Sequence, residues 1–281
     1  MDILYLVGKG SKCNDWELRF SLRSIEKYCK NVGRVFVVGY CPSWLSDEVI
    51  KIEKPILPSF GNNDKNKNIY RDLLYAVENS DIGVNDNGEF LISMDDHFYC
   101  HETDFNNYPF YVKDYTKRKC RHMLPLEYEP GFNCGDYQKL LVSTANFLNE
   151  RDYSFINFTL HRNMHMNRYF IEQMKDLNEE IFNNDDIFVE GAAVALNYRY
   201  TKEPFDYIIC EDKKTDNVKQ IKNIIEDEDQ HVFSTNDFNL VSPLFIFLRR
   251  FYNKPSKYEK NNNIVSFNNK NSNKASKKTS S

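Results

Sequence analysis

The chain has 281 residues, of which 41% are hydrophobic and 15% aromatic, and its formal net charge is −4. This composition predicts a folded, globular protein with a substantial packed core. No window of about 18 apolar residues is present and the first residues lack a signal-peptide pattern, so we expect no membrane span and a cytoplasmic location. The seven cysteines are scattered without a CxxC pair, which predicts reduced thiols and argues against a disulfide framework or zinc knuckle.

Charge is distributed unevenly along the chain. Seven lysines and one glutamate give residues 253–281 a formal charge of +6, which leaves −10 for residues 1–252. An acidic body is not typical of a dedicated nucleic-acid clamp. The end of the chain is rich in Asn, Ser and Lys, so we predict a single folded domain over 1–252 and a disordered tail over 253–281.

The first predicted elements form a strand, helix, strand unit. Residues 3–7, ILYLV, are an apolar run typical of a buried strand. A helix follows, with Asn14 or Asp15 as the expected N-cap and Glu17 in capping-box spacing from Asn14. The β-branched stretch 32–40 predicts a second buried strand. This order is typical of a parallel sheet, because a parallel return needs a crossover of about a dozen residues.

The same alternation continues to residue 100. A weaker strand is predicted near 49–52, a helix over 69–78 and another strand over 89–94. The first hundred residues therefore predict an α/β sheet. In open α/β sheets, ligands bind at the carboxyl ends of the strands.

The pattern is weaker in the second half of the chain. Helices are predicted over 138–150 and 166–182, and a strand over 187–200. Residues 216–230 predict a polar, partly helical surface segment. Residues 244–252, LFIFLRRFY, predict a final helix or strand that packs against the body.

An acidic cluster directly follows the strand over 89–94. It consists of Asp95, Asp96 and His97. Because adjacent carboxylates repel each other, we expect a positive group beside them. Two carboxylates and an imidazole suit a hard divalent cation such as Mg²⁺ or Mn²⁺, which bridges protein to substrate phosphates. The alternative is that the aspartates begin a turn and that His97 is a surface residue.

Basic residues indicate where a phosphate would bind. Lys65, Lys67 and Arg71 surround the start of a predicted helix, where backbone N–H groups favour an anion. Gly8 and Lys12 add flexible backbone and a positive charge after the first strand. The GKGSK stretch has neither P-loop nor GxGxxG spacing, which argues against a Walker-type ATPase and a nicotinamide dehydrogenase.

Several stretches resemble a known family. Residues 14–45, which include ELRFSLRSIEKY, closely resemble the second conserved region of the Stealth proteins, which transfer hexose 1-phosphates in capsule synthesis. They are also similar to phage and bacterial GT-A glycosyltransferases. NKNIYRDLL and FLISMDDHFY resemble the donor-site helix and the DxD-type metal motif of those enzymes, and KPSKYE near the end resembles the family more weakly. The chain departs from the Stealth proteins at residues 94–97, where it has Met-Asp-Asp-His and they have Asn-Asp-Asp-Met.

The resemblance implies a fold and a separate binding role for each half of the chain. The fold is α/β of the GT-A type, a Rossmann-like, mostly parallel mixed sheet flanked by helices, with a helical C-terminal part. Residues 1–100 would bind a nucleoside-diphosphate sugar and residues 101–252 the acceptor.

The resemblance also implies roles for particular side chains. An Mn²⁺ or Mg²⁺ ion would be held by Asp96, His97 and a distant histidine, His161 or His165. The donor would contact a second set of residues: Gly8, Lys12, Lys67, Arg71 and Asp95. An inverting transfer needs a carboxylate as base. Asp136 and Glu190 are the candidates because each lies beside a glycine in an apolar or aromatic setting; the alternative is a retaining transfer without such a base.

We therefore expect a metal-dependent glycosyltransferase that acts on a hydroxyl acceptor. The acceptor is a glycan or, if a phage encodes the chain, a hydroxymethylated DNA base, with the lysine tail on DNA phosphates. One alternative is transfer of a sugar 1-phosphate, which releases a nucleoside monophosphate. Another is a non-catalytic module that binds a nucleotide sugar.

Overall fold

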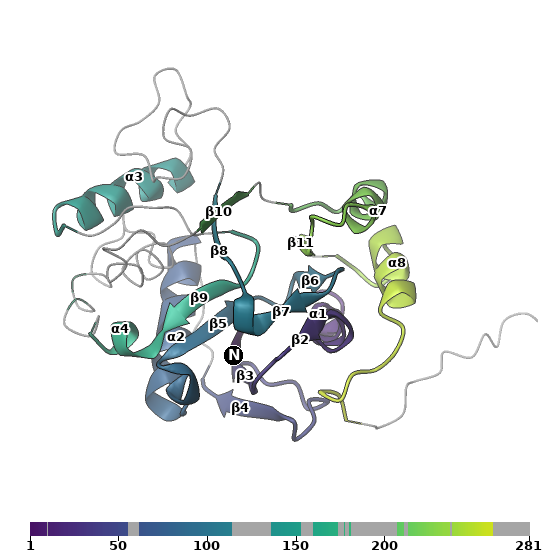
Figure 1. Cartoon of the computed structure of the whole chain (residues 1–281), viewed down its shortest axis with the longest axis horizontal. Helices are drawn as coiled ribbons and strands as arrows, with labels where there is room; N and C mark the ends of the chain where they lie inside the picture. The colour runs from purple at the N-terminus through teal and green to yellow at the C-terminus, as the bar shows by residue number, and fades with distance from the viewer. Residues whose placement is uncertain are drawn as a thin grey trace, which may run out of the picture.

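The computed structural model describes residues 1–9, 11–55, 62–113, 136–152, 160–173, 177, 180, 207–210, 213–236 and 238–260. Within them lies a five-stranded sheet of order β4-β3-β1-β5-β9 (Figure 1). Its strands are β1 (Asp2–Val7), β3 (Val35–Gly39), β4 (Val49–Glu53), β5 (Glu89–Ser93) and β9 (Met164–Asn167). The first four are parallel, and β9 pairs antiparallel with β5. The predicted mostly parallel sheet flanked by helices is confirmed.

Two crossover helices cover opposite faces of this sheet. Helix α1 (Trp16–Tyr28) joins β1 to β3, and α2 (Asn62–Asn79) joins β4 to β5. Successive residues of a strand point to opposite faces, so Tyr5 of β1 packs in one core with α1 and Leu4 packs in another core with α2. Every residue of β1 is buried, as expected for a parallel strand covered on both sides.

The α2 face of the sheet carries two more helices. Helix α3 (Asp136–Asn149) confirms the helix predicted over 138–150, and α4 (Arg168–Gln173) packs in the same core. The prediction of one helix over 166–182 is wrong at its start, because residues 164–167 form strand β9. Met164 and Met166 both face this core, and that period of two is characteristic of a strand. The strand predicted over 187–200 lies outside the described residues.

The last part of the chain covers the outer face of α1. Helices α7 (Val218–Glu226) and α8 (Pro243–Phe251) surround Phe20 together with an antiparallel pair, β6 (His97–Tyr99) and β11 (Val232–Ser234).

None of the helices described here has the length and apolar character that crossing a bilayer requires. The shorter elements are β2 (Cys29–Lys30), β7 (Thr103–Asp104), β8 (Phe110–Lys113), β10 (Tyr207–Cys210), η1 (Val84–Asp86) and η2 (Phe105–Asn107).

The start of α1 is not the predicted capping box. Asp15 is the N-cap residue, but it has a left-handed φ of 59° and its side chain makes no capping hydrogen bond. Ser11 orders this turn instead: its Oγ accepts a hydrogen bond from the Asp15 N–H at 2.9 Å and donates one to Glu17 Oε2 at 2.6 Å.

Residues 253–260 belong to the folded body, so the predicted boundary after residue 252 is placed too early. Glu259 is 6% exposed and accepts hydrogen bonds from Arg23 Nε and Nη2 at 2.7 and 2.8 Å, and from Arg19 Nη1 at 2.6 Å. Arg23 is itself buried. We call these three residues the arginine clasp. It fastens the end of the described chain to α1.

Gly39 shapes the edge of the sheet where β3 ends. Its φ is +93°, and a Cβ atom added there would lie 2.5 Å from the Val7 carbonyl oxygen of β1. We therefore expect Gly39→Ala to lower the free energy of unfolding by about 2 kcal/mol or more, since strained backbone alone costs 1–3 kcal/mol. Urea unfolding measures the change. Gly8→Ala is the matched control, because an added Cβ meets no atom within 4 Å there; equal effects of the two variants would contradict the prediction.

Candidate functional site

The chain reverses its direction of travel across the sheet between β1 and β5. From β1 it moves outward through β3 to β4, and α2 then returns it to the other side of β1. The carboxyl ends of β1 and β5 are consequently adjacent, and the loops after them diverge. In doubly wound sheets this position forms a crevice in which ligands bind. Residues 8–15 follow β1 here, and residues 94–97 follow β5.

The acidic cluster forms a tight turn at this point. The His97 N–H donates to the Met94 carbonyl oxygen at 3.3 Å, and the Met94 N–H donates to His97 Nδ1 at 3.5 Å. Asp95 and Asp96 are partly exposed, whereas His97 is 1% exposed. The turn predicted as the alternative interpretation therefore exists, but His97 is a buried residue and not a surface one.

The turn is fixed from below by a chain of hydroxyl groups. Ser21 Oγ of α1 donates to the His97 carbonyl oxygen at 2.6 Å, so it accepts from the Tyr5 hydroxyl, 2.8 Å away. Burial raises the pKa of Tyr5, which keeps this phenol protonated and a donor. The central strand and the first helix thus both hold the acidic turn in place.

A lysine supplies the positive charge expected beside the two carboxylates. Lys214 Nζ lies 3.8 Å from Asp96 Oδ2, and His97 Nε2 lies 3.7 Å from Asp96 Oδ1. Because His97 Nδ1 accepts a hydrogen bond, the neutral ring carries its proton on Nε2, toward Asp96. Lys214 was not predicted from the sequence, since it is distant in the chain and lies outside any regular element.

Lys214 lies beside the turn because its segment pairs with β11. The Thr215 N–H donates to the Ser234 carbonyl oxygen at 3.0 Å, and the Ser234 N–H donates to the Lys213 carbonyl oxygen at 3.1 Å. Ser234 is also the β11 partner of His97 in the β6–β11 pair. Residues 213–215, β11 and the acidic turn are therefore successive neighbours.

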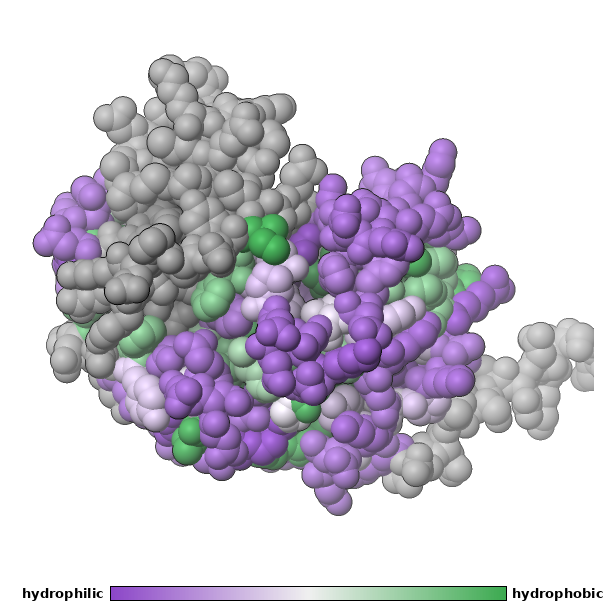
Figure 2. Space-filling model, viewed as in Figure 1, coloured by the Kyte–Doolittle hydropathy of each residue, from purple (hydrophilic) through white to green (hydrophobic). Residues whose placement is uncertain are grey.

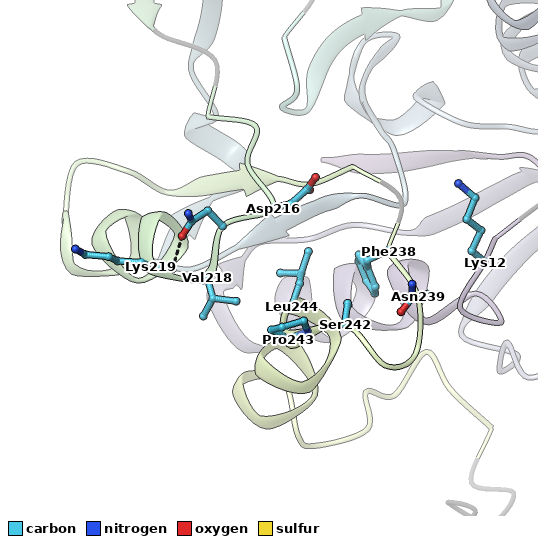
Figure 3. A pocket seen from close by; sticks show the side chains of 10 residues that line it. Lys12, Asp216, Val218, Lys219, Phe238, Asn239, Ser242, Pro243 and Leu244 are labelled. Atoms are coloured by element: carbon cyan, nitrogen blue, oxygen red, sulfur yellow. Dashed lines mark hydrogen bonds between the residues drawn. The ribbon is translucent and has the colours of Figure 1, made fainter.

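A cleft of about 500 Å³ adjoins this segment (Figure 3). It lies between Lys12, from the loop after β1, and the first residues of α7 and α8. Asn217 caps α7 by accepting from two backbone N–H groups, and Ser242 caps α8 in the same way with one. The lining residues are Lys12, Asp216, Asn217, Val218, Lys219, Phe238, Asn239, Ser242, Pro243 and Leu244.

Asp216 connects the cleft to the acidic turn, two residues along the chain from Lys214. Its two carboxylate oxygens accept hydrogen bonds from the backbone N–H and the side-chain amide of Asn236, both at 2.7 Å. These bonds hold the 213–217 segment against the residues that follow β11. The cleft and the acidic turn are thus parts of one edge of the molecule.

A buried cation lies behind β5. Arg162 is 3% exposed, donates to Gln230 Oε1 at 3.1 Å and stacks over the Tyr111 ring at 4.7 Å. Among the described residues it has no carboxylate partner, and its Nε is buried without a hydrogen bond. The next residue, Asn163, places Oδ1 3.2 Å from the Ser93 hydroxyl at the end of β5. Neither residue was predicted from the sequence, since no local pattern marks it.

The predicted donor residues take different positions. Lys12 lines the cleft, and Gly8 lies exposed after β1. Helix α2 begins at Asn62, so Lys67 and Arg71 lie within it. The prediction had placed them around the start of the helix. Lys67 is buried, and Arg71 Nη1 donates to Asn68 Oδ1 at 3.1 Å. They do not form a helix N-terminal phosphate site.

The two histidines predicted to share a helical face do not do so. His161 lies in a bend, and His165 lies in β9, where its Nε2 is 2.8 Å from the Tyr108 carbonyl oxygen and its ring stacks on Phe110. Within the described ranges, no three His, Cys, Asp or Glu side chains gather into a metal-binding group, so Asp96, His97 and His161 do not form one.

The two predicted bases remain predictions. Asp136 is the first residue of α3, but its side chain lies outside the described part of the structure, and Glu190 lies outside it entirely.

Thiols are poor candidates for a nucleophile in the described part of the chain. Cys13, Cys29, Cys41 and Cys100 are free cysteines. Burial raises the pKa of Cys13 and of Cys100 to about 12 and that of Cys41 to about 11. These groups are therefore protonated near neutral pH and lack the thiolate that attacks a substrate.

No protein-family model and no curated protein matches the chain. The candidate site is therefore defined by its position and chemistry. It combines two adjacent carboxylates at a strand end, a lysine opposite them, and a cleft with lysines and a phenylalanine in its walls.

Proposed function

We propose that the protein is a glycosyltransferase that transfers a sugar from a nucleoside diphosphate to a hydroxyl acceptor. The observation that carries this proposal is the position of Asp95 and Asp96, which closely follow β5 at the point where the chain reverses across the sheet. Two adjacent carboxylates repel each other, so folding rarely gains from placing them together there. A negatively charged donor with its counter-ion accounts for both the acids and the surrounding lysines.

The carboxylates of Asp95 and Asp96 are ligands of the kind that Mg²⁺ or Mn²⁺ prefers. Such ions use one or two carboxylates and complete their coordination with substrate phosphates and water, so Asp95 and Asp96 would hold the ion. When bound, the ion would act as a Lewis acid toward the diphosphate. His97 contributes by position, since its buried ring fixes the turn.

Cationic side chains of this edge support the departure of a diphosphate. Lys214 already faces Asp96, and Lys12 lies across the cleft near Phe238. Positive charge placed where negative charge develops lowers the barrier to transfer, provided that it is fixed before the reaction. The hydrogen bonds of the 213–217 segment supply that fixation. The cleft walls come mainly from residues 216–244, in agreement with an acceptor-side role for that half of the chain.

Thermal melting with a panel of nucleoside diphosphates and nucleotide sugars tests the proposal. With Mn²⁺ present, we expect one nucleotide to raise Tm by several degrees, because ligand at a hundredfold its Kd stabilises a fold by about 2.7 kcal/mol. EDTA should remove the shift. The double variant Asp95→Asn, Asp96→Asn should melt normally and show no shift.

Product analysis then separates the two kinds of transfer. Release of a nucleoside diphosphate supports glycosyl transfer, and release of a monophosphate shows transfer of a sugar phosphate. If no nucleotide changes Tm, the proposal fails and the acidic turn is only a strand end.

A further inference from the structure

Apolar side chains are exposed where α8 begins. Leu240, Val241 and Ile246 are 41%, 82% and 47% exposed, and they lie within seven residues of one another. Single exposed apolar residues are ordinary, but a cluster marks an interaction site. Figure 2 shows hydrophobic surface over the position of α8, beside hydrophilic surface.

Helix α8 is amphipathic and has a second face that is free of the core. Its inner face packs against α1 through Leu244, Phe245 and Leu248. The outer face carries Ile246 and then, one turn later, Arg249 and Arg250, which are both exposed. The outward surface thus changes from apolar at its start to cationic at its end.

The cationic part continues beyond the helix. Five basic residues of the stretch 238–260 are exposed: Arg249, Arg250, Lys254, Lys257 and Lys260. The acid of the same stretch, Glu259, is buried in the arginine clasp. Two acids of other segments lie close to its last residues: Glu26 of α1 accepts from the Lys257 N–H, and Glu48 acts on Tyr258. The charged side chains that the stretch itself exposes are all basic, on a chain whose net charge is −4.

We propose that the start and outer face of α8 dock on an anionic lipid bilayer. Leu240, Val241 and Ile246 would enter the interface, and the following cations would contact the headgroups. Apolar side chains beside exposed arginines and lysines are the combination that binds such surfaces. A nucleic acid would use the cations but would gain nothing from a valine that is 82% exposed.

Docking would also orient the cleft. Asn239, Ser242 and Pro243 line its wall, and Leu240 and Val241 lie between them in the chain (Figure 3). The bilayer would therefore lie beside this wall of the cleft. This inference rests on the surface of α8 and is independent of the proposed sugar transfer.

Co-sedimentation of the full chain with vesicles tests the proposal. We expect binding to vesicles of phosphatidylcholine with about 30 mol% phosphatidylglycerol and little binding to pure phosphatidylcholine. The partition coefficient should be roughly tenfold or more higher on the anionic vesicles. Arg249→Gln and Arg250→Gln should each weaken binding about fivefold. Val241→Asp should weaken it at least as much.

Val84→Asp is the matched control, because Val84 is 49% exposed on η1 and lies outside this surface. It should leave vesicle binding unchanged. Both variants retain the lysines of residues 253–281, so these lysines contribute equally to the two measurements. Failure to bind anionic vesicles overturns the proposal, and so does an equal effect of Val84→Asp and Val241→Asp. If the α8 variants instead abolish self-association measured by light scattering, the surface covers a second copy of the chain and the membrane proposal is wrong.

Discussion

Replacing Asp96 with asparagine should reduce sugar transfer by about 100-fold or more. The substitution keeps the shape of the turn and removes the charge that faces Lys214 and, under the proposed function, holds the donor's counter-ion. Folding should be nearly unchanged, because the pair is partly exposed and such pairs contribute about 0–1 kcal/mol. Steady-state release of nucleoside diphosphate and a thermal melt measure the two effects.

Asp47→Asn provides the comparison, since the Asp47 side chain is fully exposed in a pair with Lys51, outside the candidate site. Full activity of Asp96→Asn would contradict the proposed site. Lys214→Met distinguishes two sources of positive charge. If transfer resists EDTA but requires Lys214, the lysine neutralises the diphosphate and the metal part of the proposal is wrong.

Removing the carboxylate of the arginine clasp should have the largest effect on stability. Glu259→Gln leaves Arg23 buried without its charge partner, and breaking a buried pair in this way costs about 3–5 kcal/mol. Urea unfolding should show the midpoint shift. Glu102→Gln is the control, because Glu102 pairs with Lys30 in an exposed position, where we expect a change below about 1 kcal/mol.

The effect of Glu259→Gln on stability should depend on pH. Burial alone raises the pKa of Glu259, but the hydrogen bonds and charge of Arg23, with Ser256 and Arg19, outweigh it and hold the pKa below its ordinary value of 4.5. The native state therefore releases this proton more readily than the unfolded state does. The free energy of unfolding that the Glu259 carboxylate contributes is complete above pH 4.5, and it is lost as pH falls through the lower native pKa. The difference between wild type and Glu259→Gln should shrink over that range; a constant difference would contradict the clasp.

The sheet was predictable because its signals are local. The runs at 3–7 and 89–94 became β1 and β5, since a strand buried on both faces is apolar along its length. The crossover α1 was predictable for a similar reason, because its spacing of apolar residues matches a helix. The acidic turn followed from its place after β5.

The cations beside that turn and behind β5 were not predictable. Lys214 faces Asp96 and Arg162 donates to Gln230 through contacts between distant segments, and neither lies in a recognisable pattern. The spacing of His161 and His165 fits one face of a helix and also one face of a strand, so pairing of β9 with β5 decided the structure.

Two stretches that lie far apart in the sequence meet in the clasp. Arg19 and Arg23 lie in ELRFSLRSIEKY, and Glu259 ends KPSKYE. The arginines therefore bind the end of the described chain to α1. These residues serve the architecture, whereas the residues after β5 carry the proposed chemistry.

The clasp also determines when the chain can finish folding during synthesis. Glu259 is made 236 residues after Arg23, which at ribosomal rates of 5–20 residues per second is an interval of roughly 12 to 47 seconds. Until then α1 lacks the carboxylate for its arginines and the helices that cover its outer face. The second element to leave the ribosome is thus among the last to be secured.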